Sequence, residues 1–242
     1  MIRVENVHKT FVLHQQHGVR LPVLADASLT VNAGECVVLH GHSGSGKSTL
    51  LRSISGMNPI AGGEILFCGE KITGLPSSLI ARKGLCMVPE GRQLFPELSA
   101  RDNLLIGAYP YRKDKARVQK NLDFAYQMFP AIRKYEDRMA NTFSGGEQQM
   151  ISIARGLMSE PKLMMIDEMS LGLAPMIIAD LFKVIKRLNA QGISILLVEQ
   201  NARQALRIAD RAYVMENGRM VMEGSGKELL ENEHVKVAYL GM

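Results

Sequence analysis

The stretch Gly41-His42-Ser43-Gly44-Ser45-Gly46-Lys47-Ser48-Thr49 decides how the rest of the chain is interpreted. It fits the spacing G-x-x-x-x-G-K-[ST] of a phosphate-binding P-loop. The apolar run Cys36–His40 before it predicts a buried strand, and Thr49–Ile54 after it predicts a helix that ends near Gly56. Strand, glycine-rich loop and helix, in that order, are the context in which this spacing binds a nucleotide. The stretch therefore predicts a nucleotide site at the end of a strand.

The residue types of this loop suit the phosphates of ATP. Glycines let the backbone turn its N–H groups toward an anion, and the start of the helix adds a partial positive charge. Lys47 is expected to reach the β- and γ-phosphates, and the Ser48 hydroxyl to bind Mg²⁺. Phe11, just before a polar loop at His14–Arg20, is either a core side chain or a ring that stacks on adenine. The predicted nucleotide-binding residues are Phe11, Gly41, His42, Ser43, Gly44, Ser45, Gly46, Lys47, Ser48 and Thr49.

Composition limits the class of protein. The chain has 242 residues, enough for one large α/β domain, and 46% of them are hydrophobic. A net charge of +5 suits an anionic partner, but 5% aromatic residues and no block of Lys and Arg argue against a nucleic-acid binder. The N-terminus has no apolar signal, and no apolar run approaches the roughly 20 residues that span a bilayer. We therefore expect any attachment to a membrane to occur through other chains.

The cysteines and histidines predict no metal centre or disulfide. Cys36, Cys68 and Cys86 are widely spaced and each lies among apolar neighbours. Such an odd, scattered set is typical of reduced thiols in the core of a cytosolic protein. The six histidines form no ligand pattern.

Strands and helices alternate along most of the chain. Ile2–Val7, Leu24–Val31 and Gly63–Cys68 predict short strands, and Asn217-Gly218 predicts a hairpin turn. Leu85–Val88, Leu163–Ile166 and Ile193–Val198 are apolar runs typical of buried strands. Between them, helices are expected at 100–108, where Ser99 is the cap, at 114–129, from about 145, and at 175–189. This order favours an α/β fold with a mostly parallel sheet.

Two carboxylates follow a buried strand downstream of the P-loop. Asp167, at the end of the apolar run, is the expected Mg²⁺ partner. Glu168 should point to the opposite side of the strand and face the attacking water as a general base. With the P-loop present, an acidic turn without function is the weaker interpretation.

Phe143-Ser144-Gly145-Gly146-Glu147-Gln148-Gln149 closely resembles the LSGGQ signature of the ATP-binding-cassette (ABC) ATPases. In that family the signature faces the γ-phosphate of ATP bound by the opposite subunit. The resemblance therefore implies a head-to-tail pair of cassettes with ATP and Mg²⁺ between them. The residues expected to contact the partner's ATP are Ser144, Gly145, Gly146, Glu147 and Gln148.

The resemblance implies a P-loop NTPase fold of ABC type, with an N-terminal antiparallel β subdomain and an inserted helical subdomain. We expect one nucleotide-binding domain over 1–242. Within it, 1–88 and 160–242 form the catalytic core, and 89–159 form the helical subdomain that carries the signature.

From about residue 55 onward the chain resembles one ABC subgroup, the second ATP-binding subunit of branched-chain amino-acid importers. The motifs that carry this likeness are Val88–Arg92, Ser170–Pro175, Leu197–Asn201 and Ala238–Gly241. The first 53 or so residues instead resemble an ABC-type subunit of phosphonate breakdown, the carbon–phosphorus lyase system. That likeness rests on Lys9–Gln16, Leu21–Leu24 and Leu39–Gly46.

Three residues depart from the general ABC pattern. Glu90 stands where a glutamine usually contacts the metal or the water, and its carboxylate is tolerable beside Mg²⁺. Gln200 stands where a histidine usually contacts the γ-phosphate; its amide can donate a hydrogen bond but cannot titrate. Met169 replaces a proline, which could loosen the turn that aims Glu168. By resemblance, the catalytic residues are Glu168, Gln200 and Lys47, and the metal ligands are Ser48, Asp167 and Glu90.

The leading hypothesis is the ATP-hydrolysing subunit of an ABC importer for branched-chain or other hydrophobic amino acids. It would be cytoplasmic, peripheral on the inner face of the cell membrane. Its partners would be a second ATPase subunit (a copy or a different chain), transmembrane permease subunits and, indirectly, a periplasmic binding protein, with no nucleic acid. Two alternatives remain: a soluble ABC-type subunit of a phosphonate-degrading complex, and a nucleotide-gated interaction module with weak hydrolysis.

Overall fold

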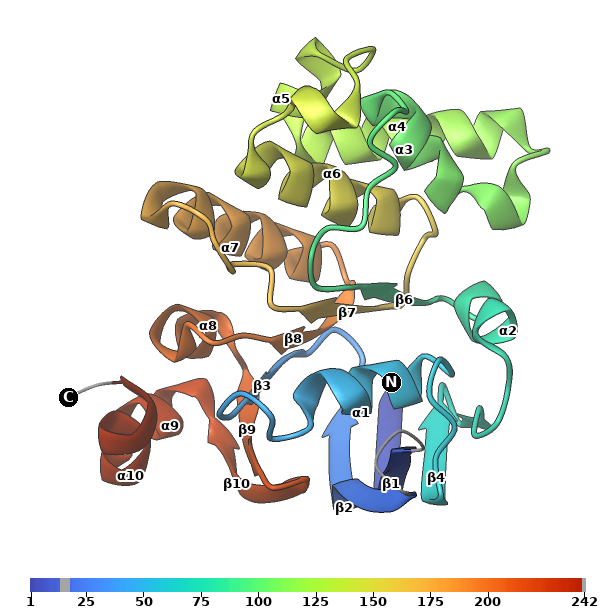
Figure 1. Cartoon of the computed structure of the whole chain (residues 1–242). Coiled ribbons are helices and arrows are strands. Elements are labelled where there is room, and N and C mark those ends of the chain that lie inside the picture. Colours follow the sequence, from blue (N-terminus) through green and yellow to red (C-terminus); the bar gives the residue numbers. More distant parts are fainter. Residues whose placement is uncertain (14–17, 241–242) are drawn as a thin grey trace.

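A six-stranded sheet runs through the middle of the molecule (Figure 1), as seen in a computed structural model that describes residues 1–13 and 18–240. Its strand order is β10-β9-β3-β8-β7-β6. Strands β9, β3, β8, β7 and β6 are parallel, and β10 pairs antiparallel with β9 at one edge. The strands are β3 (Cys36–His40), β6 (Leu85–Val88), β7 (Leu163–Asp167), β8 (Ser194–Val198), β9 (Arg211–Glu216) and β10 (Arg219–Ser225).

Alternation along β3 divides the apolar core between the two faces of this sheet. Val37 and Leu39 pack on one face with α1 (Lys47–Ile54), and Cys36 and Val38 pack on the other. Successive strand residues point to opposite faces, so a strand that is apolar throughout must be covered on both. The buried runs at 85–88, 163–166 and 193–198 form β6, β7 and β8, as predicted.

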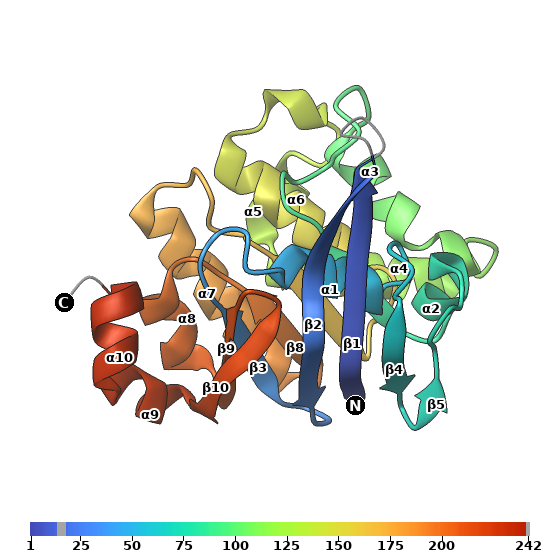
Figure 2. The ribbon, with the colours of Figure 1, turned by 60° about the horizontal axis from the view of Figure 1, so that its bottom comes forward.

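A second, four-stranded antiparallel sheet lies across α1 from the first (Figure 2). Its order is β2-β1-β4-β5, with β1 (Ile2–Leu13), β2 (Val19–Val31), β4 (Gly62–Phe67) and β5 (Glu70–Lys71). The expected polar loop at His14–Arg20 is too long. Val19 and Arg20 extend β2, where they pair with Leu13 and Val12, while residues 14–17 lie outside the described part.

Helices fill the chain between β6 and β7 and lie at the top of Figure 1. Ser99 caps α3 by accepting a hydrogen bond from the Asp102 N–H, and Asp114 caps α4 in the same way through Arg117. The predicted helices are confirmed within one or two residues, whereas the assignment of 89–159 as a separate subdomain stays a prediction. The elements here are α3 (Ala100–Gly107), a 3₁₀ turn (Tyr109–Tyr111), α4 (Lys115–Met128), α5 (Pro130–Lys134), a 3₁₀ turn (Ala140–Thr142) and α6 (Gly145–Leu157).

The remaining helices surround the large sheet. Helix α7 packs its apolar stripe on the face opposite α1, with Leu181, Ile185 and Leu188 fully buried. These helices are α2 (Ser77–Arg82), α7 (Pro175–Ala190), α8 (Ala202–Ile208), α9 (Gly226–Glu231), α10 (Glu233–Val235) and a π-helical turn at Lys236–Leu240. Among the described residues, no helix is both long and apolar enough to cross a membrane.

The cysteines are all free, but one prediction about them is wrong. Cys36 is buried, and burial raises the pKa of its thiol to about 12. Cys68 is exposed instead of lying in the core. It follows β4 in a tight turn with φ 52°, and a turn at the edge of a sheet leaves its side chain in solvent.

Candidate active site

Three parallel strands end side by side and deliver the predicted site residues to one edge of the sheet. Leu39 of β3 pairs with Val198 of β8, which also pairs with Asp167 of β7. The segments that follow these strands line a hollow of about 440 Å³. Its lining residues are Leu21, Val23, Ser43, Gly44, Gly46, Lys47, Ser48, Thr49, Glu90, Glu168, Leu171 and Gln200.

The P-loop can hold its shape only with glycine at certain positions. Gly41 has φ 155°, and a Cβ placed on it would lie 2.2 Å from the backbone oxygen of Met215. Gly46, at the start of α1, has φ 111°, and a Cβ there would lie 2.9 Å from the backbone oxygen of Val23. Side chains at these two sites would therefore collide with β9 and β2. The loop is packed tightly enough to keep its N–H groups in a fixed orientation.

Lys47 is buried, and the loop's own carbonyl groups hold its ammonium group. Its Nζ donates to the backbone oxygens of Gly41 and His42, at 2.8 Å each. Burial lowers the pKa of Lys47, while the carboxylates of Glu168 and Asp167 act in the opposite direction. Carbonyl oxygens are weaker partners for an ammonium group than phosphate oxygens. Lys47 is therefore positioned to exchange these contacts for an anion.

Ser48 and Asp167 meet as predicted. The Ser48 hydroxyl donates to Asp167 Oδ1 at 3.0 Å. The other carboxylate oxygen, Oδ2, is buried and has no hydrogen-bond partner within the described part of the chain. Burial raises the pKa of Asp167, and the neighbouring charges of Glu168 and Glu90 add to this, while the Ser48 hydrogen bond opposes it. A buried carboxylate oxygen beside a hydroxyl and a second carboxylate fits a hard cation such as Mg²⁺.

Glu168 reaches the hollow, but not in the expected way. Strand β7 ends at Asp167, so alternation along the strand does not aim Glu168. Its backbone turns into the left-handed region with φ 47°, and its N–H donates to the Val198 oxygen at 2.9 Å. Its carboxylate accepts a hydrogen bond from Gln200 Nε2 at 2.8 Å. The side chain is thus aimed by this turn and by the Gln200 amide.

Phe11 does not line the hollow, whereas its neighbour does. Phe11 pairs directly with Leu21 across β1 and β2, so the two side chains lie on the same face of the sheet. Leu21 and Val23 line the hollow, and Lys9 Nζ lies 4.7 Å from the centroid of the Phe11 ring. The sequence analysis missed Leu21 and Val23. Their position beside the P-loop depends on how β2 packs against it, which no local pattern reveals.

The signature residues stand apart from this hollow. Ser144 caps α6 in a capping box: its hydroxyl accepts from the Glu147 N–H, and the Glu147 carboxylate accepts from the Ser144 N–H at 2.8 Å. Gly145 and Gly146 open the helix, and Gln148 Nε2 donates to the backbone oxygens of Ala140 and Phe143. None of these residues lines the P-loop hollow. Within one chain, the signature therefore lies outside the P-loop hollow.

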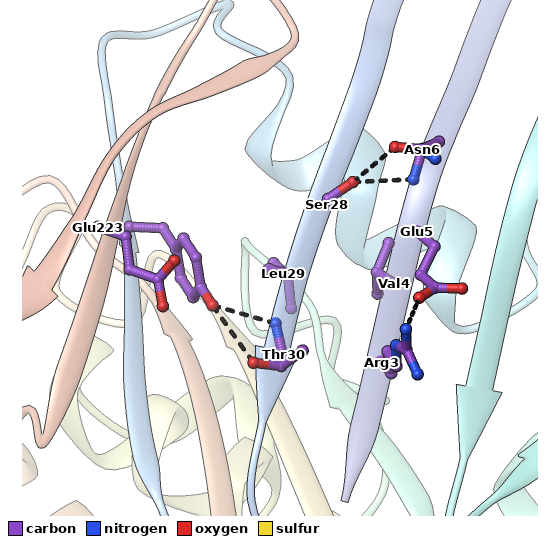
Figure 3. A pocket seen from close by; sticks show the side chains of 9 residues that line it. Arg3, Val4, Glu5, Asn6, Ser28, Leu29, Thr30 and Glu223 are labelled. Atoms are coloured by element: carbon purple, nitrogen blue, oxygen red, sulfur yellow. Dashed lines mark hydrogen bonds and ion pairs between the residues drawn. The ribbon is translucent and has the colours of Figure 1, made fainter.

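A second hollow lies on the outer face of the small sheet (Figure 3). Its volume is about 310 Å³. Arg3 pairs with Glu5, and Ser28 accepts a hydrogen bond from the Asn6 N–H at 2.8 Å. Tyr213 Oη accepts from the Thr30 N–H at 3.2 Å. The polar groups around this hollow have protein partners, unlike Asp167 Oδ2. No predicted site residue lines it among the residues that the structure describes.

Comparison with known proteins places this geometry in a family. Residues 24–170 match the family model described as ABC transporter. The chain belongs to the ABC transporter family of ATP-binding proteins. The predicted P-loop fold class is thereby confirmed, and the chain is a nucleotide-binding ATPase of this family. ATPases of the family work as dimers and with membrane permease subunits.

Two curated relatives and one solved structure indicate how far the similarity extends. The chain is 49% identical to the high-affinity branched-chain amino acid transport ATP-binding protein BraG of Pseudomonas aeruginosa, over 92% of this chain and 94% of that one. It is 34% identical to the lipopolysaccharide export system ATP-binding protein LptB of Escherichia coli K12, over 90% and 91%. The crystal structure of a nucleotide-free ATP-binding cassette from an ABC transporter superposes with a TM-score of 0.85 at 27% identity, covering 100% of this chain and 99% of that one.

The match to BraG bears on the mixed resemblance of the N-terminal part. Because 92% of the chain is covered, the similarity cannot begin only near residue 55. It extends into the first 53 residues, where the sequence analysis noted a likeness to a subunit of phosphonate breakdown.

Proposed function

We propose that the P-loop hollow binds ATP through the glycine-rich loop and Lys47. The observation that carries this proposal is the loop itself: among the described residues, the hydrogen-bond partners of buried Lys47 are carbonyl oxygens of the loop, at the positive end of α1. Leu21 and Val23 form an apolar wall of the same hollow, which suits the adenine base. Phe11, paired with Leu21, would extend that wall at its outer edge.

The metal of this site would be Mg²⁺. Ser48 Oγ and Asp167 Oδ2 would hold it, together with Glu90, which lines the hollow. When bound, Mg²⁺ neutralises charge on the phosphates of ATP. The Ser48–Asp167 hydrogen bond already keeps the two oxygen groups together, so little rearrangement is needed. The described residues offer no group of three or more His, Cys, Asp and Glu side chains for a metal, so oxygens of the phosphates and of water would complete the coordination.

Glu168 would act on the attacking water, and Gln200 would orient Glu168. Glu168 lines the same hollow as Lys47, and its carboxylate accepts a hydrogen bond from Gln200 Nε2. One amide donor leaves the other carboxylate oxygen available to take a proton from water. Gln200 cannot titrate, so its amide serves for positioning and for a contact with the γ-phosphate.

Two cassettes would close over ATP because the signature lies outside the P-loop hollow of its own chain. Ser144–Gln148 begin a 13-residue helix whose N–H groups can serve an anion brought by another subunit. Light scattering on Glu168→Gln, with and without Mg-ATP, tests this, alone and mixed with the second ATPase subunit. An ATP-dependent doubling of mass in either sample is expected. A monomer in both samples that still binds ATP would overturn the head-to-tail arrangement.

The solute would be a branched-chain amino acid, taken up through a permease whose binding protein lies on the other side of the membrane. This rests on 49% identity to BraG, well above the 34% identity to LptB. The chain would sit on the cytoplasmic face of the membrane, held there by the permease. Uptake of labelled leucine by cells lacking the chain, and by cells given it back, tests the assignment. Equal uptake in both, or co-purification with soluble enzyme subunits only, would contradict it.

Residues 89–143 would contact the permease and carry the motion. Phe95, Leu98 and Met139 are 49%, 38% and 51% exposed. Leu98 and Met139 are neighbours, because Ala140 N–H donates to the Leu98 oxygen at 2.9 Å. Exposed apolar side chains gathered in this way favour a protein interface. Met139→Asp should reduce co-purification with the permease while ATP binding is unchanged.

A further inference from the structure

Two loops leave the large sheet next to each other and are joined by side chains. One is Glu168–Ser170, after β7, and the other is Glu199–Gln200, after β8. Gln200 Nε2 donates to Glu168 Oε2 at 2.8 Å. Ser170, two residues after Glu168, donates twice to Glu199, the residue before Gln200: its N–H to Oε1 at 3.0 Å and its hydroxyl to Oε2 at 2.5 Å. These contacts join the two loops at two places.

Glu199 is an unusual residue for this place because its side chain is fully buried. Its exposed fraction is 0%, and no lysine or arginine forms an ion pair with it among the described residues. Burying a carboxylate is costly unless hydrogen bonds replace the lost water. Here Ser170 supplies two, and the N–H groups of Gln200 and Asn201 add others. The sequence analysis assigned Glu199 no role of its own.

The backbone of Glu199 reaches the P-loop as well. Its carbonyl oxygen accepts a hydrogen bond from His40 Nδ1 at 2.8 Å, and His40 directly precedes Gly41. The residue therefore contacts the entry of the P-loop through its backbone and the loop after β7 through its carboxylate. Its next neighbour in sequence, Gln200, touches Glu168. All three segments around the proposed reaction centre are tied to this one position.

The turn after Glu168 also needs contacts that fix its conformation. Met169 stands where the general ABC pattern has a proline, and an ordinary residue leaves the turn more conformational freedom. Met169 is itself buried, at 1% exposure, in the apolar core between the large sheet and α7. The Glu199–Ser170 hydrogen bonds fix the following residue. Ser170 and Met169 together thus hold the left-handed turn that aims Glu168.

We infer that Glu199 is a positioning residue for ATP hydrolysis: its buried carboxylate holds Ser170 and thereby fixes Glu168 and Gln200 relative to the P-loop. This rests on the proposed role of Glu168. It predicts that the contact matters for turnover and not for ATP binding, because neither Glu199 nor Ser170 lines the hollow. Positioning errors of about 1 Å at a reaction centre can cost a hundredfold in rate.

The test compares Glu199→Gln, Ser170→Ala and the double variant in the same ATPase assembly as the wild type. Each single variant should lower kcat for ATP by about tenfold or more and change KM less than about twofold. The double variant should be no slower than the slower single variant, because both changes remove one shared contact. An unchanged kcat in folded Glu199→Gln, or two rate losses that multiply in the double variant, would overturn the inference.

A matched control and a second readout separate positioning from general stability. Ser194→Ala removes a buried serine at the other end of β8, whose hydroxyl accepts from the Gly34 N–H at 2.9 Å. That variant should unfold more easily and keep the wild-type kcat. Hydrogen exchange of the amides of residues 168–171 should quicken in Glu199→Gln and stay unchanged in Ser194→Ala. Equal rates of hydrogen exchange in the two variants would overturn the inference. A wild type that hydrolyses ATP no faster than Glu168→Gln would instead overturn the proposed function.

Discussion

The P-loop hollow and the hollow on the small sheet differ more in chemistry than in size. The P-loop hollow measures about 440 Å³ and the hollow on the small sheet about 310 Å³. Beside the first, within the described part of the chain, buried Asp167 Oδ2 has no hydrogen-bond partner and Lys47 Nζ donates to carbonyl groups of its own loop. In the second, Arg3 pairs with Glu5, and Thr30 bonds to Tyr213. One site has polar groups held ready for a ligand, and the other has polar groups that serve each other.

This difference shows why volume alone does not identify a site. A buried polar group without a partner costs free energy, so one that lies beside a hollow is a candidate for binding a ligand. Saturated polar groups in a hollow stabilise the fold without that cost. Substitutions around the first hollow should therefore change ATP chemistry, and substitutions around the second should change stability or nothing. The predictions below test this division.

The largest effect is expected for Glu168→Gln. The change keeps the shape of the side chain but removes the base, so phosphate release should fall by about a hundredfold to a thousandfold. ATP affinity should change less than about threefold, since the variant leaves the P-loop intact. Steady-state phosphate release and ATP titration measure the two quantities. Turnover near the wild-type rate would remove Glu168 from the reaction.

Arg211→Met should cost about 3 kcal/mol of unfolding free energy, because it strips the partner from partly buried Glu35. Arg211 bonds to Glu35 at 2.8 and 3.0 Å, to Glu223 at 2.6 Å and to the Thr30 oxygen at 2.9 Å. Its contacts join β9, β10 and β2 beside the second hollow. Urea unfolding measures the loss, with Arg219→Met as control, since Arg219 is exposed and lies 3.7 Å from Asp26. A changed ATP affinity in folded Arg211→Met would contradict the expectation that substitutions around the second hollow leave ATP binding unchanged.

Acidification should weaken the ion pair between Arg211 and Glu35. Burial raises the pKa of Glu35, but hydrogen bonds from Arg211 and Asn32 and the Arg211 charge outweigh it, so the pKa lies below its usual 4.5. A carboxyl group whose pKa is lower in the folded state contributes stability above pH 4.5 and loses it as pH falls through the folded value. Unfolding free energy should therefore drop on acidification below pH 4.5. The drop should be smaller in Arg211→Met; an equal drop would assign the acid sensitivity to other carboxylates.

The smallest effect is expected for Arg3→Ala combined with Glu5→Ala. This pair lines the second hollow, but its side chains are 64% and 35% exposed. Exposed ion pairs contribute little, so the unfolding free energy should change by less than about 1 kcal/mol. ATP affinity should not change at all. A large loss of affinity would mean that the second hollow takes part in nucleotide binding.

Features that depend on residues close together in the chain were predictable from the sequence. The P-loop spacing, the apolar strands of the large sheet and the cap at Ser99 depend on near neighbours in the chain. The hairpin at Asn217-Gly218 is equally local, because both residues adopt positive φ, of 47° and 79°. Residues 163–167 therefore brought Asp167 to its place beside Ser48 as expected.

Features that depend on distant contacts were missed. Leu21 lines the P-loop hollow because β2 continues to Val19 and packs beside the P-loop. The turn at Glu168 has positive φ in a residue that rarely adopts it, and β8 stabilises it through the Val198 oxygen. The buried carboxylate of Glu199 depends in part on Ser170, 29 positions away, which donates two hydrogen bonds to it. No window of sequence contains such pairs.

An ATP titration on three proteins tests the central claim most directly. These are the wild type, Lys47→Ala, and the combined Arg3→Ala and Glu5→Ala variant, each followed by calorimetry in the presence of Mg²⁺. We expect the lysine variant to lose at least about thirtyfold in affinity, since a charge-assisted contact contributes roughly 2 kcal/mol or more. The second-hollow variant should bind ATP as the wild type does. Wild-type affinity in Lys47→Ala, or lost affinity in the second-hollow variant, would contradict the assignment of the nucleotide to the P-loop hollow.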